Sequence, residues 1–366
     1  MGVERFKPRF KLRVIEVSGS AYDRGYKHGE ECRESIKKFV KEFYEGFKGR
    51  LTKDQIQRHV RKHIPFIEEY SSEVAEEIKG IAEGSGCTYE DIAMLSLLEE
   101  IGGFTRLMPH TCTALAAAGE ATAEEAVFIG ENLDSSVKRY AEGKFPILLK
   151  VKDSSGPSYI AWSMPGIPAG AGLNSEGIGI VWNSVERVEL RIGVPTYVII
   201  SEIMHQKTIG DALGAVFTAK RAGCFNFLIA DGHGELYDVE ATPSDAEVYY
   251  SDTCIGHANH FVSEKMKKKI TVAGFGRHSS SLVRHNRVNK LLKENLGRID
   301  LKTCMSILSD HVNYPYSICR HPEPVKDEKA YRGVTWDSLL MVLNKGECWI
   351  SHGPPCSNRY QKHVIE

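Results

Sequence analysis

The spacing of apolar residues divides the chain into a helical first third and a strand-rich remainder. One alternating run at 11–18 predicts a strand. Apolar positions then recur at helical spacing and predict helices over 20–48, 54–83 and 92–98. Helical spacing returns later in the chain, at 196–206, 209–221, 282–297 and 303–312.

Short apolar or alternating runs bounded by glycine, asparagine and aspartate predict strands in the remainder. They lie at 127–132, 147–151, 158–162, 225–230, 235–240, 246–250, 334–343 and 347–351. Residues 172–183 predict a turn between two further strands, and the lysine- and serine-rich stretch 262–281 predicts a solvated loop. This order of elements predicts a single domain over 1–366 of class α+β, with stacked sheets between helix layers.

Two glycines in the first predicted helix indicate a close helix contact. Gly25 and Gly29 stand four residues apart, so they share one helix face and would let another backbone approach. His28 lies beside them and is expected to pack or to cap rather than to bind a ligand.

Composition excludes several broad classes of protein. A chain of 366 residues with 42% hydrophobic content can bury a large core. Its 47 Lys and Arg against 48 Asp and Glu give no general attraction to nucleic acid or to acidic membranes. We expect no transmembrane helix, because apolar runs of eighteen residues do not occur. The polar start at 1–7 lacks a signal-peptide core and the ending at 362–366 is not a peroxisomal address, so the expected location is cytoplasmic.

Nine cysteines are scattered along the chain without a CxxC pair. An odd, dispersed set argues against a disulfide framework and against a zinc site, and it is typical of a reducing compartment. We therefore expect no metal and no cofactor.

Cys112 is the cysteine with the strongest catalytic context. It follows Thr111 and precedes a run of small residues, and a buried strand about twenty residues later ends in Asp134. Two short strands joined by a loop would bring Cys112 and Asp134 to one sheet edge. A thiol is the most nucleophilic side chain near neutral pH, so Cys112 is a candidate acyl acceptor. The alternative is that it is a small buried core residue.

Polar residues gather after the strand predicted at 246–250. His257 or His260 could activate a thiol, and Asn259 could orient the base or donate to an oxyanion. They could equally be polar residues at a strand end, and two histidines alone make a weak metal site. Arg284 and Arg287 lie one helical turn apart and are expected to be solvent-exposed charges.

Eight short sequence blocks follow one another along the chain, at 22–29, 77–84, 112–113, 130–134, 172–177, 257–260, 284–287 and 313–320. The last block reads Asn-Tyr-Pro-Tyr-Ser-Ile-Cys-Arg. In this order the blocks resemble the isopenicillin-N acyltransferase family of N-terminal-nucleophile hydrolases.

This resemblance implies a four-layer αββα fold and a precursor that cuts itself between Thr111 and Cys112 into chains 1–111 and 112–366. Cys112 would then be the nucleophile. The freed α-amino group, whose reference pKa is about 7.7–8.0, would serve as its base. Because the amino group would then act as the base, no catalytic histidine is needed, and His257 and His260 would have structural roles.

The resemblance also implies roles for four other residues. Asn259 matches an oxyanion-stabilising asparagine, and Asp134 matches an acid that holds the new ammonium or an arginine. Arg320 would be the ionic partner of Asp134, and Ser317 a polar neighbour of the substrate. The substrate would be a small-molecule amide, such as an N-acyl amine or an aminoacyl amide, or an acyl thioester.

Thr111 departs from the glycine that better-known relatives carry before the nucleophile. A β-branched residue tolerates a strained scissile bond less well than glycine, so we expect slower cleavage. Two alternatives remain: an uncleaved Cys–His thiol hydrolase, and an uncleaved relative that binds a ligand or a partner. The oligomeric state stays open.

Overall fold

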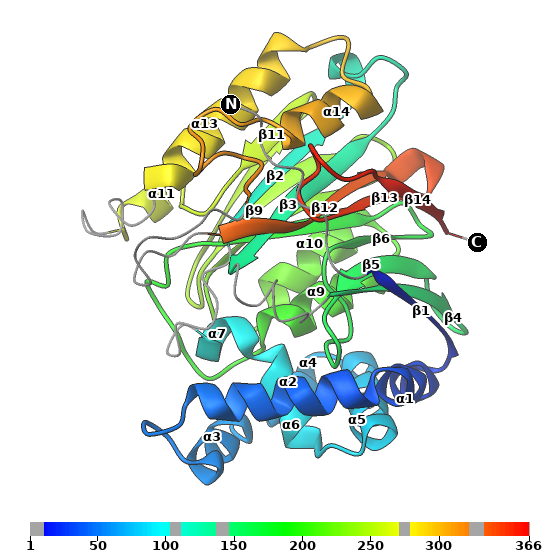
Figure 1. Ribbon diagram of the computed structural model, residues 1–366, viewed down its shortest axis with the longest axis vertical. Helices are drawn as coiled ribbons and strands as arrows, with labels where there is room; N and C mark the ends of the chain where they lie inside the picture. Colours follow the sequence, from blue (N-terminus) through cyan, green and yellow to red (C-terminus); the bar gives the residue numbers. More distant parts are fainter. Residues whose placement is uncertain (1–10, 103–110, 137–145, 271–278, 322–332, 366) are drawn as a thin grey trace.

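Two β-sheets packed face to face lie at the centre of the molecule (Figure 1). The computed structural model describes residues 11–102, 111–136, 146–270, 279–321 and 333–365. Within these residues the first sheet contains, in spatial order, β1 (Arg13–Gly19), β4 (Ile147–Asp153), β5 (Tyr159–Ser163), β6 (Gly172–Asn174), β7 (Gly179–Ser184), β8 (Phe225–Ala230), β9 (Leu236–Ala241) and β10 (Ala246–Ser251). The second contains β11 (Cys254–His257), β2 (Thr111–Ala117), β3 (Phe128–Ser136), β12 (Gly333–Val342), β13 (Glu347–His352) and β14 (Gln361–Val364).

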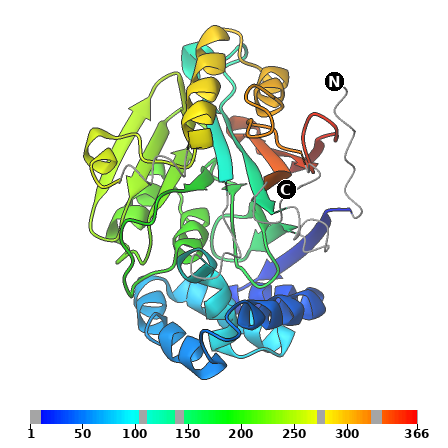
Figure 2. The same ribbon diagram turned by 60° about the vertical axis from the view of Figure 1, so that its left-hand side comes forward.

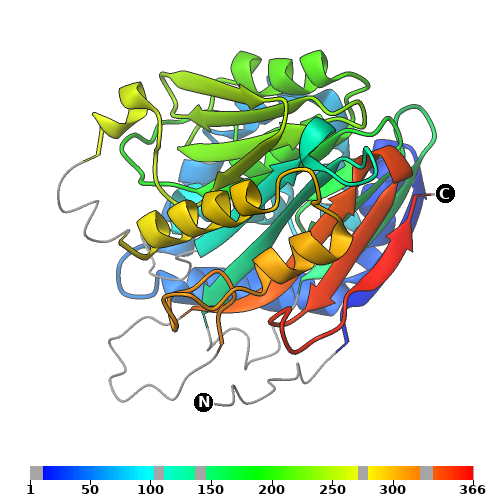
Figure 3. The ribbon, with the colours of Figure 1, turned by 90° about the horizontal axis from the view of Figure 1, so that it is seen from above.

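Helices cover the outer face of each sheet (Figure 3). The first sheet carries α9 (Thr196–Met204) and α10 (Ile209–Thr218). The second carries α13 (Ser279–Glu294) and α14 (Leu301–Leu308). This order of layers confirms the α+β class and the four-layer αββα sandwich.

Alternation along β2 sends neighbouring side chains into two separate cores. Cys112, Ala114 and Ala116 join the large core between the sheets, whereas Leu115 and Ala117 join a smaller core beneath α13 and α14. Every residue of β2 after Thr111 is buried, because the strand is central in its sheet and covered on both faces. The thiol of Cys112 therefore lies on the inter-sheet side.

The N-terminal helices form a separate cluster at one end of the sandwich, seen in blue and cyan in Figure 2. They are α1 (Ala21–Glu31), α2 (Arg33–Gly46), α3 (Lys53–Val60), α4 (Ile64–Tyr70), α5 (Ser72–Ser85), α6 (Tyr89–Ser96) and α7 (Leu98–Gly102). β1 ties the cluster to the first sheet by pairing in parallel with β4.

Glycines let α1 and α5 touch backbone to backbone, as the sequence predicted. A Cβ atom at Gly25 would stand 2.1 Å from the Glu77 carbonyl oxygen, and one at Gly29 would stand 2.4 Å from that of Ile81. His28 packs beside this contact, where its buried Nε2 accepts a hydrogen bond from the Gly166 N–H at 3.2 Å. The expected packing role of His28 is confirmed.

Three expectations about the elements were wrong. The helix predicted over 20–48 is two helices that meet at Cys32, and the region 54–83 holds three. The breaks follow local chemistry: Pro65 fits only a first helical turn, and the Ser71 side chain caps α5 by accepting from the Val74 N–H. The stretch predicted as a loop contains the short helix α11 (Glu264–Lys267) and the start of α13, and β14 was not predicted.

Gly25→Ala should lower the free energy of unfolding by about 1–3 kcal/mol or more, because the added methyl has to push two packed helices apart. Gly214→Ala is the matched control. Gly214 is also helical, and nothing lies within 4 Å of its would-be Cβ, so the change should add about 0.4–1 kcal/mol. Urea unfolding of both variants measures the difference, and equal stabilities would contradict a tight α1–α5 contact.

Candidate active site

The start of β2 brings together residues from four distant parts of the chain. β2 pairs with β3 so that Thr111 lies opposite Asp134 and Cys112 opposite Leu133. On its other side β2 pairs with β11, whose end at His257 leads directly to Asn259. The hairpin predicted from the sequence therefore forms. The residue that pairs with Asp134 is Thr111, which directly precedes Cys112.

Hydrogen bonds fix the backbone of Cys112 on both sides. Its N–H donates to Asn259 Oδ1 at 2.9 Å, and its carbonyl oxygen accepts from Arg284 Nη1. Arg284 also donates to Thr113 Oγ1 and, through Nη2, to Asn259 Oδ1, both at 2.8 Å. The amide of Asn259 donates in turn to the Ser184 carbonyl at 2.9 Å, which fixes its orientation.

Asp134 is held by three partners. Arg320 Nε lies 3.2 Å from Asp134 Oδ2, the Thr335 hydroxyl donates to Oδ1 at 2.7 Å, and the Thr111 hydroxyl lies 3.5 Å away. Burial raises the pKa of Asp134 to about 6, although Arg320, Arg284 and these hydroxyls favour its charged form. The ion pair expected between Asp134 and Arg320 is present.

The thiol of Cys112 is fully buried and lies near two acidic side chains. Burial raises its pKa well above the ordinary value, and the nearby acids Glu131 and Asp134 raise it further, whereas Arg284 lowers it. Glu131 is itself fully buried, which raises the pKa of its carboxyl well above the usual range. In the intact chain the thiol is therefore a poor nucleophile until something removes its proton.

The two histidines face other partners. His257 Nε2 lies 3.2 Å from Glu240 Oε1 and its Nδ1 lies 3.1 Å from Asn183 Oδ1. His260 Nδ1 lies 2.7 Å from the Ser281 hydroxyl. Within the described residues neither ring is hydrogen-bonded to Cys112, so the geometry gives no support to a Cys–His pair.

Ser317 lies next to this group on the segment that carries Arg320. It is buried, its hydroxyl donates to the Cys319 carbonyl at 2.5 Å, and its own carbonyl lies 3.4 Å from Arg320 Nε. The hydrogen bonds of Ser317 thus stabilise the Arg320 segment. Its predicted place beside a substrate stays a prediction.

Sequence reasoning missed two buried residues of the site. Arg284 was expected at the surface, but its side chain is 1% exposed. Arg284 is buried because α13 packs across β2 and turns this residue inward. Arg287 is partly exposed, and it pairs with Asp310 at 2.7 Å. Glu131 stood in the 130–134 block without a role. A carboxylate inside a strand that was expected to be buried was the available signal for it.

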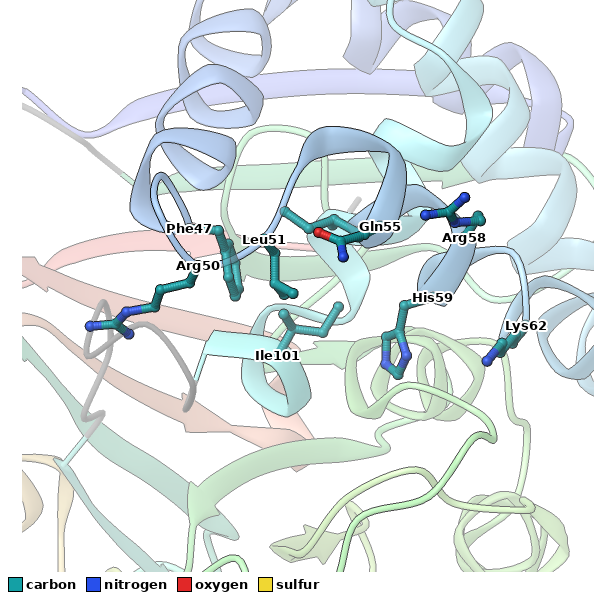
Figure 4. A pocket seen from close by; sticks show the side chains of 9 residues that line it. Phe47, Arg50, Leu51, Gln55, Arg58, His59, Lys62 and Ile101 are labelled. Carbon is teal, nitrogen blue, oxygen red and sulfur yellow. The ribbon is translucent and has the colours of Figure 1, made fainter.

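A pocket of about 690 Å³ opens among the N-terminal helices (Figure 4). Phe47, Leu51 and Ile101 are apolar parts of its wall, and Arg50, Arg58 and Lys62 are its basic residues. Its lining belongs to α3, α7 and the turns on either side of α3, not to the strands around Cys112. We therefore assign it no part in the chemistry of that cysteine.

The chain belongs to the acyl-coenzyme A:6-aminopenicillanic acid acyl-transferase family, whose model matches residues 122–330. This match confirms the resemblance seen in the sequence. It includes Asp134, Asn259, Arg284 and Arg320 but begins ten residues after Cys112.

The curated relatives that match include two of low identity. An uncharacterized protein of Archaeoglobus fulgidus is 21% identical over 82% of this chain and 58% of its own length. Protein dcd1B of Dictyostelium discoideum is 22% identical over 58% of this chain and 46% of its own. The chain thus spans about half the length of these relatives.

Solved structures with a similar fold include two hydrolases. A mutant conjugated bile acid hydrolase from Clostridium perfringens is 13% identical with a TM-score of 0.47, covering 69% of this chain and 92% of that one. Penicillin V acylase from Agrobacterium tumefaciens is 8% identical with a TM-score of 0.43, covering 66% and 83%. Likenesses this distant carry no argument about activity.

Among the described residues, no helix is both long and apolar enough to cross a membrane.

Proposed function

We propose that this chain is a self-processing cysteine amidohydrolase or acyltransferase that acts on a small-molecule amide or acyl thioester. The observation that carries the proposal is the fixed backbone of Cys112, whose N–H is bound by Asn259 and whose carbonyl is bound by Arg284. Cleavage before Cys112 would turn that N–H into an α-amino group already held at Asn259. An amine in this place can take the proton that the buried thiol has to lose.

Self-cleavage starts with attack of the Cys112 thiol on the Thr111 carbonyl carbon. A C–S bond forms, the C–N bond breaks, and the thiol proton ends on the departing nitrogen, which frees the amino group of Cys112 and leaves Thr111 as a thioester. Water then hydrolyses the thioester to a Thr111 carboxylate and a free thiol. Asp134, which lies opposite Thr111 in the sheet and is paired with Arg320, would supply the carboxylate that accepts from the new ammonium.

In turnover the amino group accepts the thiol proton while sulfur attacks the carbonyl carbon of the amide substrate. The leaving amine takes that proton, and the acyl group stays on Cys112 as a thioester. Water, or a second amine or thiol, then removes it. Asn259 Nδ2 gives one hydrogen to the Ser184 carbonyl, and its second hydrogen can stabilise the oxyanion of each tetrahedral intermediate.

Purified protein should separate on a denaturing gel into pieces of roughly 12 and 28 kDa, as cleavage before the nucleophile requires, while native sizing shows one particle near 40.9 kDa or a multiple of it. N-terminal sequencing of the larger piece should begin at Cys112. A chain that stays at full length and still turns over an amide would favour an uncleaved thiol hydrolase. One that neither cuts nor turns over would favour a binding module.

Thr111→Gly should accelerate self-cleavage, because glycine adopts the strained backbone that an N-to-S acyl shift requires more readily than threonine. A time course of cleavage after refolding measures the rate. Thr111→Ser is the control, because it keeps the hydroxyl that faces Asp134 but removes the β-branch. A Gly variant that cuts no faster than the Ser variant would show that backbone strain does not limit the step.

The rate of self-cleavage should rise with pH. Burial raises the pKa of the Cys112 thiol, so the thiolate fraction grows about tenfold per pH unit across the neutral range. Below pH about 6 the fall should become steeper, because Asp134 takes up a proton there and releases Arg320. In a plot of log rate against pH, this steeper fall appears as a break in slope near pH 6. The break should be absent in Asp134→Asn, and a break that persists in this variant would mean that another group titrates there.

A further inference from the structure

Two cysteines and two histidines converge at the base of the segment that carries Arg320. They are His311, Cys319, His321 and Cys356, and their ligand atoms all lie within 4.8 Å of one another. His321 Nε2 is 3.0 Å from His311 Nε2, 3.7 Å from Cys319 Sγ and 3.1 Å from Cys356 Sγ. Four ligand atoms of the kinds that bind zinc thus surround one point.

We propose that these four side chains form a structural zinc site. Tetrahedral Zn²⁺ with Zn–S bonds near 2.3 Å and Zn–N bonds near 2.0–2.1 Å sets its ligand atoms about 3.3–3.8 Å apart. The three distances from His321 Nε2, 3.0, 3.1 and 3.7 Å, would have to change by no more than about 0.5 Å to meet that geometry. The soft sulfur and imidazole donors favour zinc over magnesium or calcium, which prefer oxygen. Two thiols lose their protons on binding and two imidazoles bind neutral, so the loaded centre carries no net charge and suits a largely buried place.

Three separate segments supply the ligands, and backbone contacts hold two of them in position. His311 follows α14, and the loop after it is closed by the Cys319 N–H, which donates to the Asp310 carbonyl at 3.0 Å. Arg320 is tied to Thr335 of β12, since its N–H donates to the Thr335 hydroxyl at 3.0 Å and its carbonyl accepts the Thr335 N–H at 3.2 Å. These bonds fix the residues on either side of Arg320.

The third segment is the turn between β13 and β14, where Cys356 lies. The N–H groups of Ser357 and Asn358 both donate to the Pro354 carbonyl and shape this turn. Cys356 is exposed and His311 is half-buried, so an ion can enter from solvent, whereas Cys319 and His321 are buried beneath them. A closed four-ligand set of this kind is typical of structural zinc.

The site would position Arg320 rather than take part in catalysis. Arg320 stands between the ligands Cys319 and His321 in the chain, and its guanidinium reaches Asp134. Zinc would therefore link the C-terminal turn to the residue that pairs with Asp134 opposite Thr111. The spacing of the ligands has no CxxC pair, and for this reason the sequence argued against zinc.

Elemental analysis of the full-length protein, expressed with zinc and washed without chelator, should give about one zinc per chain. Metal-stripped protein, reduced and titrated with Co²⁺, should develop the thiolate-to-cobalt absorption and tetrahedral visible bands of a sulfur–nitrogen site. Cys356→Ser and His311→Ala should each lower retained zinc at least about tenfold. Cys87→Ser, at a half-buried cysteine outside the cluster, should retain it fully.

Thermal unfolding supplies a readout independent of activity. Chelation should lower the melting temperature of the parent protein and of Cys87→Ser, but not that of Cys356→Ser, which has no zinc to lose. Full zinc content in Cys356→Ser and in Cys319→Ser would overturn the proposal. The proposal would also be overturned if the protein contained no metal, had a Cys319–Cys356 disulfide, and bound no Co²⁺ after that disulfide was reduced.

Discussion

Cys112→Ala is expected to remain a single full-length chain and to lose turnover by a factor on the order of 10⁴ or more, as removal of a covalent nucleophile does. The reason is that one thiol serves both reactions: it attacks the Thr111 carbonyl first and the substrate carbonyl afterwards. The two readouts are a denaturing gel and a rate assay on a panel from aminoacyl amides to long-chain acyl amides and acyl thioesters.

Cys348→Ala is the matched control for this variant. Cys348 lies in β13 of the same sheet and is equally buried, so its replacement opens a similar small cavity without touching the site. The control should cut and turn over as the parent does. Undiminished turnover in Cys112→Ala would contradict the proposed function, whatever the state of the chain.

Asn259→Ala is expected to reduce kcat by about 10²–10³-fold, or about 2.7–4 kcal/mol of transition-state stabilisation, as loss of one oxyanion donor does. It also removes the acceptor of the Cys112 N–H and one acceptor of Arg284. Self-cleavage should slow as well, because the scissile peptide loses the group that fixes it. Steady-state kinetics on a substrate identified with the parent protein separate kcat from KM.

Ser281→Ala tests whether the loss is specific to the amide. The Ser281 hydroxyl accepts a hydrogen bond from the Asn259 N–H at 2.6 Å and contacts His260, so its removal disturbs the same turn without removing the side-chain amide. The expected fall in kcat is tenfold or less. Equal losses in both variants would mean that the turn, and not the amide of Asn259, supports the reaction.

The layers of the fold could be predicted from the sequence because they follow from periodicity. Strands such as β8 and β9 are short apolar or alternating runs, α10 has one apolar face, and α9 is buried on nearly all sides. Helix boundaries were less predictable, since the break at Cys32 carries no proline or glycine and depends on packing against the other N-terminal helices. β14 was missed because a short polar edge strand forms only where β13 offers a partner.

Local spacing revealed the hairpin of Cys112 and Asp134, because the two strands are neighbours in the chain. Arg320 came from the family resemblance, and the residues around Asn259 had left its role open until that resemblance was used, since contacts between residues more than a hundred positions apart leave no local pattern. Arg284 was misjudged for the same reason: an arginine on a polar helix looks exposed until α13 is packed against β2. The four ligands of the proposed zinc site lie in three segments, and only the folded chain brings them together.

Because β1 pairs in parallel with β4, the proposed cut would place the two strands in different polypeptides and change how the protein can refold. Before cleavage β1 and the N-terminal helices belong to the same polypeptide as the sheet they complete, so folding is unimolecular. After cleavage at Thr111 the same pairing joins two molecules. The yield of refolding should then depend on protein concentration, because two separate pieces have to meet in solution, whereas the uncut precursor should refold independently of concentration. The cleaved protein would therefore remain folded because it unfolds slowly, since the covalent link present during its first folding no longer exists.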